Sequence, residues 1–118
     1  MIESYRDFDV YKKSYELVKE VMRLTKAYPK DERYEIVSQI RRASLSIPLN
    51  IAEGYGKKQS AADFKRFLMM SLGSANEMQV LLDISCDLGY ISEDQHKEYL
   101  ERYDVLGKQL NTLIQRWQ

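Results

Sequence analysis

The single histidine, His96, is the residue around which a catalytic or metal site in this chain would have to be built. A carboxylate-bridged pair of metal ions in a helical bundle needs two Glu-x-x-His pairs, and nucleophilic catalysis needs a serine or cysteine beside a base. His96 has no such partner in the sequence. No Gly-x-x-x-x-Gly-Lys loop is present, and Gly54-Tyr55-Gly56 matches only two glycines of a dinucleotide fingerprint. We therefore expect no enzymatic activity, no metal ion and no cofactor.

A stripe of polar residues is the next feature that could do chemistry. Arg42, Ser46, Asn50 and Glu53 recur every three or four residues, so they share one face of a helix. Folding the following helix back on this one brings Glu77 within reach of Arg42. Because such groups are costly to bury without partners, we expect either a structural polar network of these five residues or a surface that faces a partner or ligand.

Basic residues form the other candidate site. The net charge is zero, but residues 33–66 hold seven bases against three acids, and residues 67–118 hold four bases against eight acids. Arg41 lies about 100° around the helix from Arg42 and is expected to point outward. The candidate nucleic-acid-binding residues are Arg41, Lys57, Lys58, Lys65 and Arg66. Four bases at one turn are also typical of a solvated helix end, although repetition in an oligomer would strengthen phosphate binding.

Four helices are expected to carry these residues. Apolar residues at three-to-four spacing predict helices over 8–27, from the break at Pro29 to Gly56, over 60–88 and from Ser92 onward. Ser60-Ala-Ala-Asp63 and Ser92-Glu-Asp-Gln95 read as capping boxes, and glycine permits a left-handed end at Gly54-Tyr-Gly56. Short connections then favour an all-α, antiparallel up-down four-helix bundle that forms a single domain over residues 1–118.

The second helix is expected to continue through a proline. Apolar residues keep their spacing across Pro48, which removes one backbone bond and predicts a kink near Ser44. Ala43 and Ser44 should face Gly73 and Leu72, where small residues would allow a close approach to the third helix. The first helix carries two adjacent apolar stripes, and this breadth suggests a second neighbour such as another subunit.

The segments of this second helix also resemble a known family. They are Gln39-Ile-Arg-Arg-Ala, Ser46-Ile-Pro and Asn50-Ile-Ala-Glu-Gly, followed by Leu72-Gly-Ser and Glu77. In order and spacing the chain resembles the bacterial four-helix-bundle proteins of the 23S rRNA intervening-sequence type, and more distantly the accessory variability protein of diversity-generating retroelements. The resemblance implies a homopentameric ring with suspected RNA binding, and it brings no catalytic motif.

Three functions remain open from the sequence. The first is a homo-oligomeric bundle that binds RNA or DNA, and the second is a scaffold for a protein partner such as a reverse transcriptase. The third is a small-molecule site in the polar stripe. The amino end lacks the basic and apolar pattern of a secretory signal, and the one cysteine, Cys86, cannot form an intrachain disulfide. A cytoplasmic location without membrane association is therefore expected.

Overall fold

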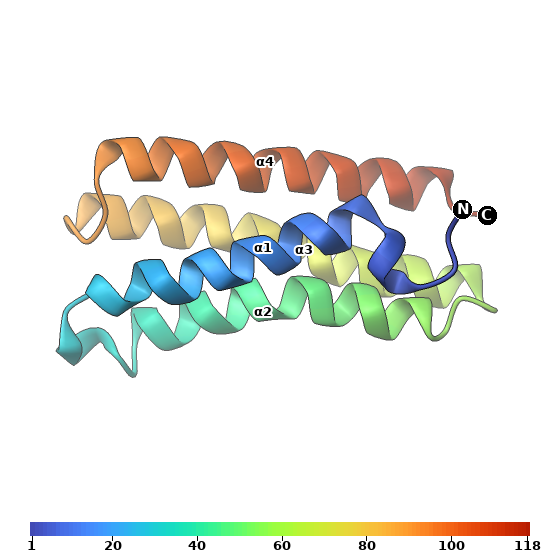
Figure 1. Cartoon of the computed structure of the whole chain (residues 1–118), viewed down its shortest axis with the longest axis horizontal. Helices are drawn as coiled ribbons and strands as arrows, with labels where there is room; N and C mark the ends of the chain where they lie inside the picture. Colours follow the sequence, from blue (N-terminus) through green and yellow to red (C-terminus); the bar gives the residue numbers. More distant parts are fainter.

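Four long helices make up most of the computed structural model, which describes residues 1–118 (Figure 1). Short 3-10 turns lie before α1 and between α1 and α2, and there is no strand. The bundle measures 44 × 24 × 20 Å, so its helices run along the long axis. The helices are α1 (Asp9–Leu24), α2 (Ile36–Tyr55), α3 (Ala61–Asp87) and α4 (Glu93–Arg116).

Contacts between neighbouring helices fix their relative directions. In each pair of neighbouring helices, the contacting residues run in opposite order along the two helices. Each of the four pairs is therefore antiparallel, as the short connections predict. The contacts are Thr25 with Arg41 and Phe8 with Tyr55, Gln39 with Glu77 and Ile47 with Ser71, Asp83 with His96 and Leu72 with Gly107, and Glu20 with Arg102 and Phe8 with Trp117.

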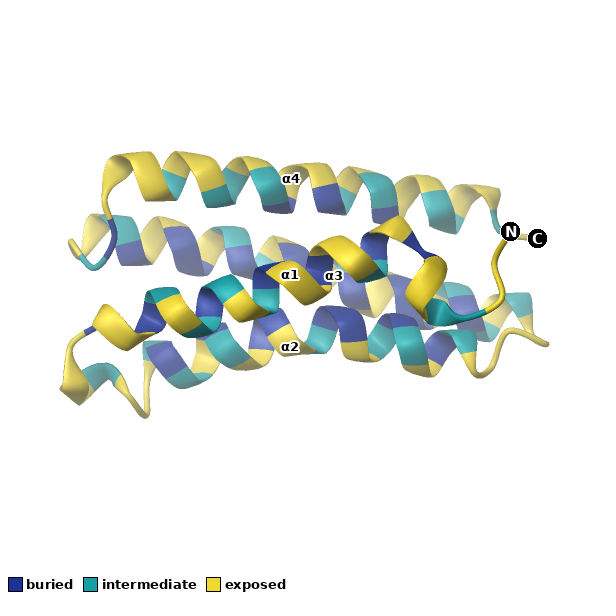
Figure 2. Ribbon diagram, viewed as in Figure 1, coloured by how far each residue is buried: buried dark blue, intermediate teal, exposed yellow.

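The core follows the apolar periodicity of the sequence. Buried positions recur at three-to-four spacing on every helix and face the bundle axis (Figure 2), which confirms the all-α four-helix prediction. None of the four helices combines the length and the apolar character needed to cross a lipid bilayer. The fully buried aliphatic core side chains include Leu17, Val21, Ile40, Ile47, Ile51, Leu68, Met78, Leu82, Leu106 and Leu110.

The helix ends confirm one capping prediction and correct two others. Ser92 and Gln95 form a complete capping box at α4. At α3, the Ser60 hydroxyl accepts from the Asp63 N–H, but the return bond is missing because the Ser60 N–H donates to the Lys57 carbonyl instead. The left-handed glycine expected after α2 is also wrong, since Gly56 has a φ of −63° and the chain continues as a tight turn. The left-handed glycine is Gly89, with a φ of 79°, after α3.

The middle of α2 is continuous, and a close approach to α3 lies near the end of α2 instead of at the predicted level. The helix passes through Pro48 without a break, and the kink expected there stays a prediction. Gly73 is exposed, and a Cβ added there would meet nothing within 4 Å, so the expected contact at this level is wrong. A Cβ on Gly54 would lie 2.6 Å from the Phe67 Cβ. The two helices therefore pack closely near their shared turn.

Candidate nucleic-acid interface

The α2–α3 turn gathers four of the predicted basic residues. Lys57, Lys58 and Arg66 are exposed and Lys65 is half-buried. None of the three lysines forms an ion pair, and Arg66 makes only a 3.9 Å contact with exposed Asp63. The local sequence explains this grouping, because two lysines occupy the turn and the other two bases lie in the first turns of α3.

Aromatic rings hold these cations in place. The Lys57 ammonium lies 5.1 Å and the Arg66 guanidinium 4.6 Å from the centre of the Phe67 ring. The Lys58 ammonium lies 4.3 Å from the centre of the Tyr55 ring. A ring face attracts a cation without neutralising it, so these side chains keep their positive charge available to an anion.

Both chain termini lie at the same end of the bundle as this turn (Figure 1). Phe8 packs 5.5 Å from Tyr55, and Trp117 packs 4.7 Å from Phe64, between ring centres. The termini therefore add Arg6 and Arg116, which sequence reasoning missed because they are far from the basic middle of the chain. We call this set the basic end: Arg6, Lys57, Lys58, Lys65, Arg66 and Arg116.

Acidic residues are present at the basic end, but they outnumber the bases only at the opposite end of the bundle. Glu3, Asp7, Asp9, Glu53 and Asp63 lie at the same end as the six bases. Bonds from the backbone N–H groups of Glu3 and Ser4 lower the pKa of Asp7, which stays ionised. At the far end, the connection between α1 and α2 carries three acids and three bases, and the adjoining ends of α3 and α4 add three more acids. We call their acids the acidic end: Asp31, Glu32, Glu35, Asp87, Glu93 and Asp94.

Arg41 does not take the outward orientation expected for it. Its side chain is half-buried, and its Nε donates to the Thr25 hydroxyl at 2.8 Å while its Nη2 donates to the Met22 carbonyl at 3.3 Å. Arg42 is the exposed neighbour and donates to the Ser38 hydroxyl at 3.1 Å. The predicted orientations of Arg41 and Arg42 are therefore wrong, because α1 packs against the face of α2 that carries Arg41.

The predicted polar network of α2 is broken into smaller contacts. Glu77 accepts from the Gln39 amide at 2.6 Å instead of from Arg42. Ser46 donates to the Ala43 carbonyl at 2.8 Å and lies within hydrogen-bond distance of the Ser74 hydroxyl.

The remaining stripe residues do not complete the network. The Asn50 amide donates to the Ser46 carbonyl at 2.8 Å. Glu53 is exposed and forms no hydrogen bond or ion pair with another side chain. The prediction of a single network of five residues is therefore wrong. The contacts that remain are local hydrogen bonds within α2 and between α2 and α3.

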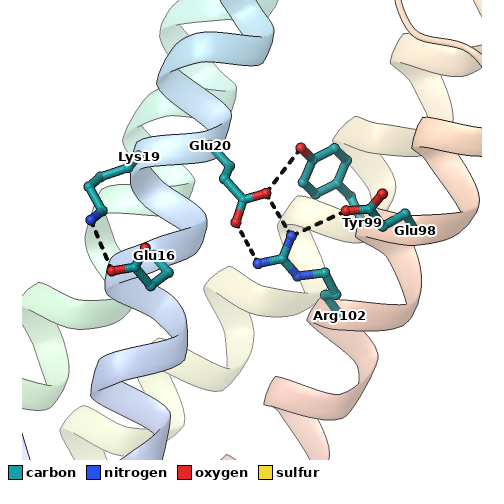
Figure 3. A network of polar contacts seen from close by, with 6 residues as sticks. All are labelled: Glu16, Lys19, Glu20, Glu98, Tyr99 and Arg102. Atoms are coloured by element: carbon teal, nitrogen blue, oxygen red, sulfur yellow. Dashed lines mark hydrogen bonds and ion pairs between the residues drawn. The ribbon is translucent and has the colours of Figure 1, made fainter.

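The most extensive side-chain cluster joins α1 to α4 (Figure 3). The Arg102 guanidinium donates to both carboxylate oxygens of Glu20, at 2.6 and 2.7 Å, and the Tyr99 hydroxyl adds a bond of 3.3 Å. The bonds from Arg102 lower the pKa of Glu20, and they raise the pKa of Arg102. Only the Glu98–Arg102 pair at i,i+4 could have suggested this cluster, because Glu20 lies far away in the sequence.

Two exposed apolar surfaces lie along the sides of the bundle. The first is a groove of about 310 Å³ between α1 and α2, whose wall includes Tyr15, Leu45 and Leu49. Leu49 leaves 63% of its surface exposed. The second runs along the outer side of α3 and comprises Met69, Val80, Ile84 and Leu88. Exposed apolar surfaces of this kind are typical of faces that contact another protein.

Comparison with known proteins identifies relatives of the whole chain. The model of the 23S rRNA-intervening sequence protein family matches residues 6–112. The fold is similar to a crystal structure of a protein of unknown function from the S23 ribosomal protein family of Bacteroides thetaiotaomicron, with a TM-score of 0.81 and 29% identity. That match covers 90% of this chain and 95% of the other. A search of curated proteins finds no match.

Proposed function

Because the chain belongs to the 23S rRNA-intervening sequence protein family, we propose that it is a non-enzymatic, homo-oligomeric bundle that binds RNA or another nucleic acid. We place this function in the cytoplasm and assign the binding to the basic end. The observation that carries the proposal is the group of three lysines at the α2–α3 turn that have no acidic partner.

The chemistry of the basic end suits phosphate groups. Lysine ammonium groups bind phosphate as point charges, and the Arg66 guanidinium can donate to two oxygens of one phosphate. Each phosphate that is neutralised releases condensed counterions, so the affinity depends steeply on the number of cations that engage. A single chain offers few cations, and an oligomer would multiply that number.

The exposed apolar surfaces support self-association. The groove between α1 and α2 and the outer face of α3 differ in shape and in residues, so contact between them would join two copies head to tail. Heterologous contacts of this kind close into a ring when the rotation between copies permits it. We propose a pentamer on the family resemblance. Light scattering of the purified protein should give about 70 kDa, five times the 13.9 kDa of one chain.

Filter binding to a structured RNA tests the proposal directly. The variant Lys57→Gln/Lys58→Gln should lose about tenfold or more in affinity at low salt, because two phosphate contacts are removed. Lys26→Gln/Lys30→Gln is the matched control, since it removes two exposed lysines at the opposite end. Equal affinities for the two variants, or no RNA binding at low salt, would contradict the proposal.

A scaffold for a protein partner is the alternative function, and the acidic end favours it. The three acids at the ends of α3 and α4 add to an α1–α2 connection with three acids and three bases, so this end could attract a basic protein such as a reverse transcriptase. Binding of such an enzyme by the purified protein, weakened by Glu93→Gln/Asp94→Gln and unaffected by nuclease, would establish this function. A complex that nuclease destroys would instead point back to nucleic acid.

A further inference from the structure

A cavity of about 610 Å³ opens beside the basic end, between the amino-terminal segment and the last turns of α4. Its apolar wall includes Phe8, Val10, Leu113 and Trp117, and its rim includes charged and polar side chains from both segments. Its volume lies within the range of small-molecule sites in proteins. Neither the polar stripe nor the lysines of the α2–α3 turn line it.

The cavity and the lysine turn share one cluster of aromatic rings. Phe8 and Trp117 pack 6.0 Å apart, and each packs within 5.8 Å of Phe64, between ring centres. Phe8 also contacts Tyr55, whose ring holds the Lys58 ammonium. Two rings, Tyr55 and Phe8, therefore separate the Lys58 ammonium from Trp117, and a bound strand of a few nucleotides can span them.

The rim offers both hydrogen-bond donors and acceptors. Arg116 supplies positive charge, Lys108 is paired with Asp104 at 3.1 Å, and Thr112 lies between Lys108 and Arg116 on the exposed side of α4. The Asp7 carboxylate accepts both of its backbone bonds through Oδ2, at 2.8 and 3.0 Å, which leaves Oδ1 without a partner. Gln109 also lines the cavity, and its side-chain oxygen is buried without a hydrogen-bond partner.

This combination matches the chemistry of a nucleotide. A base needs an apolar or aromatic surface for its faces and both donors and acceptors along its edge, while its phosphate needs a cation. Carboxylate oxygens accept from the amino groups of bases, as Asp7 Oδ1 could. We propose that this cavity receives one unpaired nucleotide of the bound strand, with the base against Trp117, whose ring is only partly buried. The inference rests on the nucleic-acid binding proposed above and adds a preference for single strands.

Trp117 is the only tryptophan, so its fluorescence reports on the cavity. The full-length protein is titrated with a single-stranded oligonucleotide and with a duplex that carries the same number of phosphates. The single strand should bind about tenfold more tightly than the duplex, because stacking adds to the phosphate contacts. It alone should quench the emission of Trp117. Equal affinities with unchanged emission would overturn this inference and leave the proposed phosphate binding intact.

Variants at neighbouring positions on α4 separate the cavity from general electrostatics. Thr112→Glu places a negative charge on the rim and should abolish both the quenching and the single-strand preference. Asn111→Glu makes the same charge change at the next exposed position, outside the cavity lining, and should preserve both. Lys57→Gln/Lys58→Gln should weaken single strand and duplex alike. If Thr112→Glu and Asn111→Glu behave identically, the assignment of the cavity is wrong.

Discussion

Gly54 is the residue whose role in the structure differs most from its apparent role in the sequence. Its position near the end of a helix indicated a backbone requirement, but α2 passes through it in helical geometry. The lack of a side chain matters instead, because α3 places the Phe67 Cβ where a Gly54 Cβ would collide. Periodicity identifies which residues face inward, but it does not give the distance between two helices.

Substitutions of two helical glycines should therefore have opposite effects. Gly54→Ala should lower the free energy of unfolding by about 1–3 kcal/mol, because the packed backbone of α3 must shift. Gly73→Ala is the control, and it should raise stability by about 0.5–1 kcal/mol because the site is open and alanine favours the helix. Urea unfolding of the two variants and the parent measures both changes. A stabilising Gly54→Ala would show that the close approach is not real.

The ion pair of Glu20 with Arg102 predicts how the stability of the protein depends on pH. Bonds from Arg102 lower its pKa in the folded protein below the ordinary value of 4.5, so folding favours the ionised form. Its contribution is complete above that ordinary value and is lost as the pH falls through the lowered pKa. Glu20→Gln should cost about 1 kcal/mol at neutral pH, since the pair is partly exposed, and the difference from the parent should shrink in acid. Thermal unfolding of both proteins across this pH range measures it, and a gap that widens in acid would refute the prediction.

The orientations of the Arg41 and Arg42 side chains could not be predicted from the sequence. Adjacent arginines both fit the edge of an amphipathic helix, and the pattern alone leaves the rotation of that helix open by tens of degrees. The packing of α1 decides it, because buried Thr25 provides a hydroxyl for Arg41. The Glu20–Arg102 pair was missed for a related reason, since the two residues meet only after the chain has folded.

At the scale of elements, the helices themselves followed from local signals. Apolar spacing and the two serine caps depend on residues within one or two turns, so they can be recognised before the fold is known. The absence of the reciprocal bond at Ser60 could not be predicted, because Ser60 also ends a tight turn in which its N–H donates to the Lys57 carbonyl. Polar contacts between helices depend on their mutual rotation and were predicted less well.

The difference between the two caps can be measured. Ser92→Ala removes the hydroxyl of a complete capping box, and Ser60→Ala removes the single cap of α3. Each substitution removes one bond from a backbone N–H and should lower the free energy of unfolding by about 0.5–2 kcal/mol. The double variant Ser92→Ala/Gln95→Ala also removes the reciprocal bond of the box and should have the larger effect. Chemical denaturation gives the three values. A larger loss for Ser60→Ala than for the double variant would mean that the α2–α3 turn depends on its cap more than the hydrogen bonds indicate.

At the scale of the whole molecule, charge and apolar surface divide the bundle into separate regions. The basic and acidic ends lie about one bundle length apart, and the exposed apolar faces lie along the sides. The sequence showed the charge asymmetry by segments, but it did not show that both termini join the α2–α3 turn at one end. That arrangement follows from an even number of antiparallel helices, which returns the chain to the end where it began.

The apolar sides give a prediction for assembly. Leu49→Lys should reduce the oligomer to smaller species, because it places a charge in the exposed groove between α1 and α2 without touching the core. Glu53→Lys is the control, since it lies one turn further along the same helix on an exposed position outside that groove. Light scattering compares their masses. An oligomer that survives Leu49→Lys and dissociates with Glu53→Lys would place the interface on another face.

The central claim is that the basic end binds nucleic acid through its phosphates, and the salt dependence of affinity tests it most directly. Fluorescence anisotropy with a labelled RNA should give a logarithm of affinity that falls linearly with the logarithm of salt concentration. For each binding site, Lys57→Gln/Lys58→Gln should reduce that slope by about 2, and Lys26→Gln/Lys30→Gln should leave it unchanged. An affinity that is indifferent to salt, or a slope that changes only with the second pair, would contradict the account.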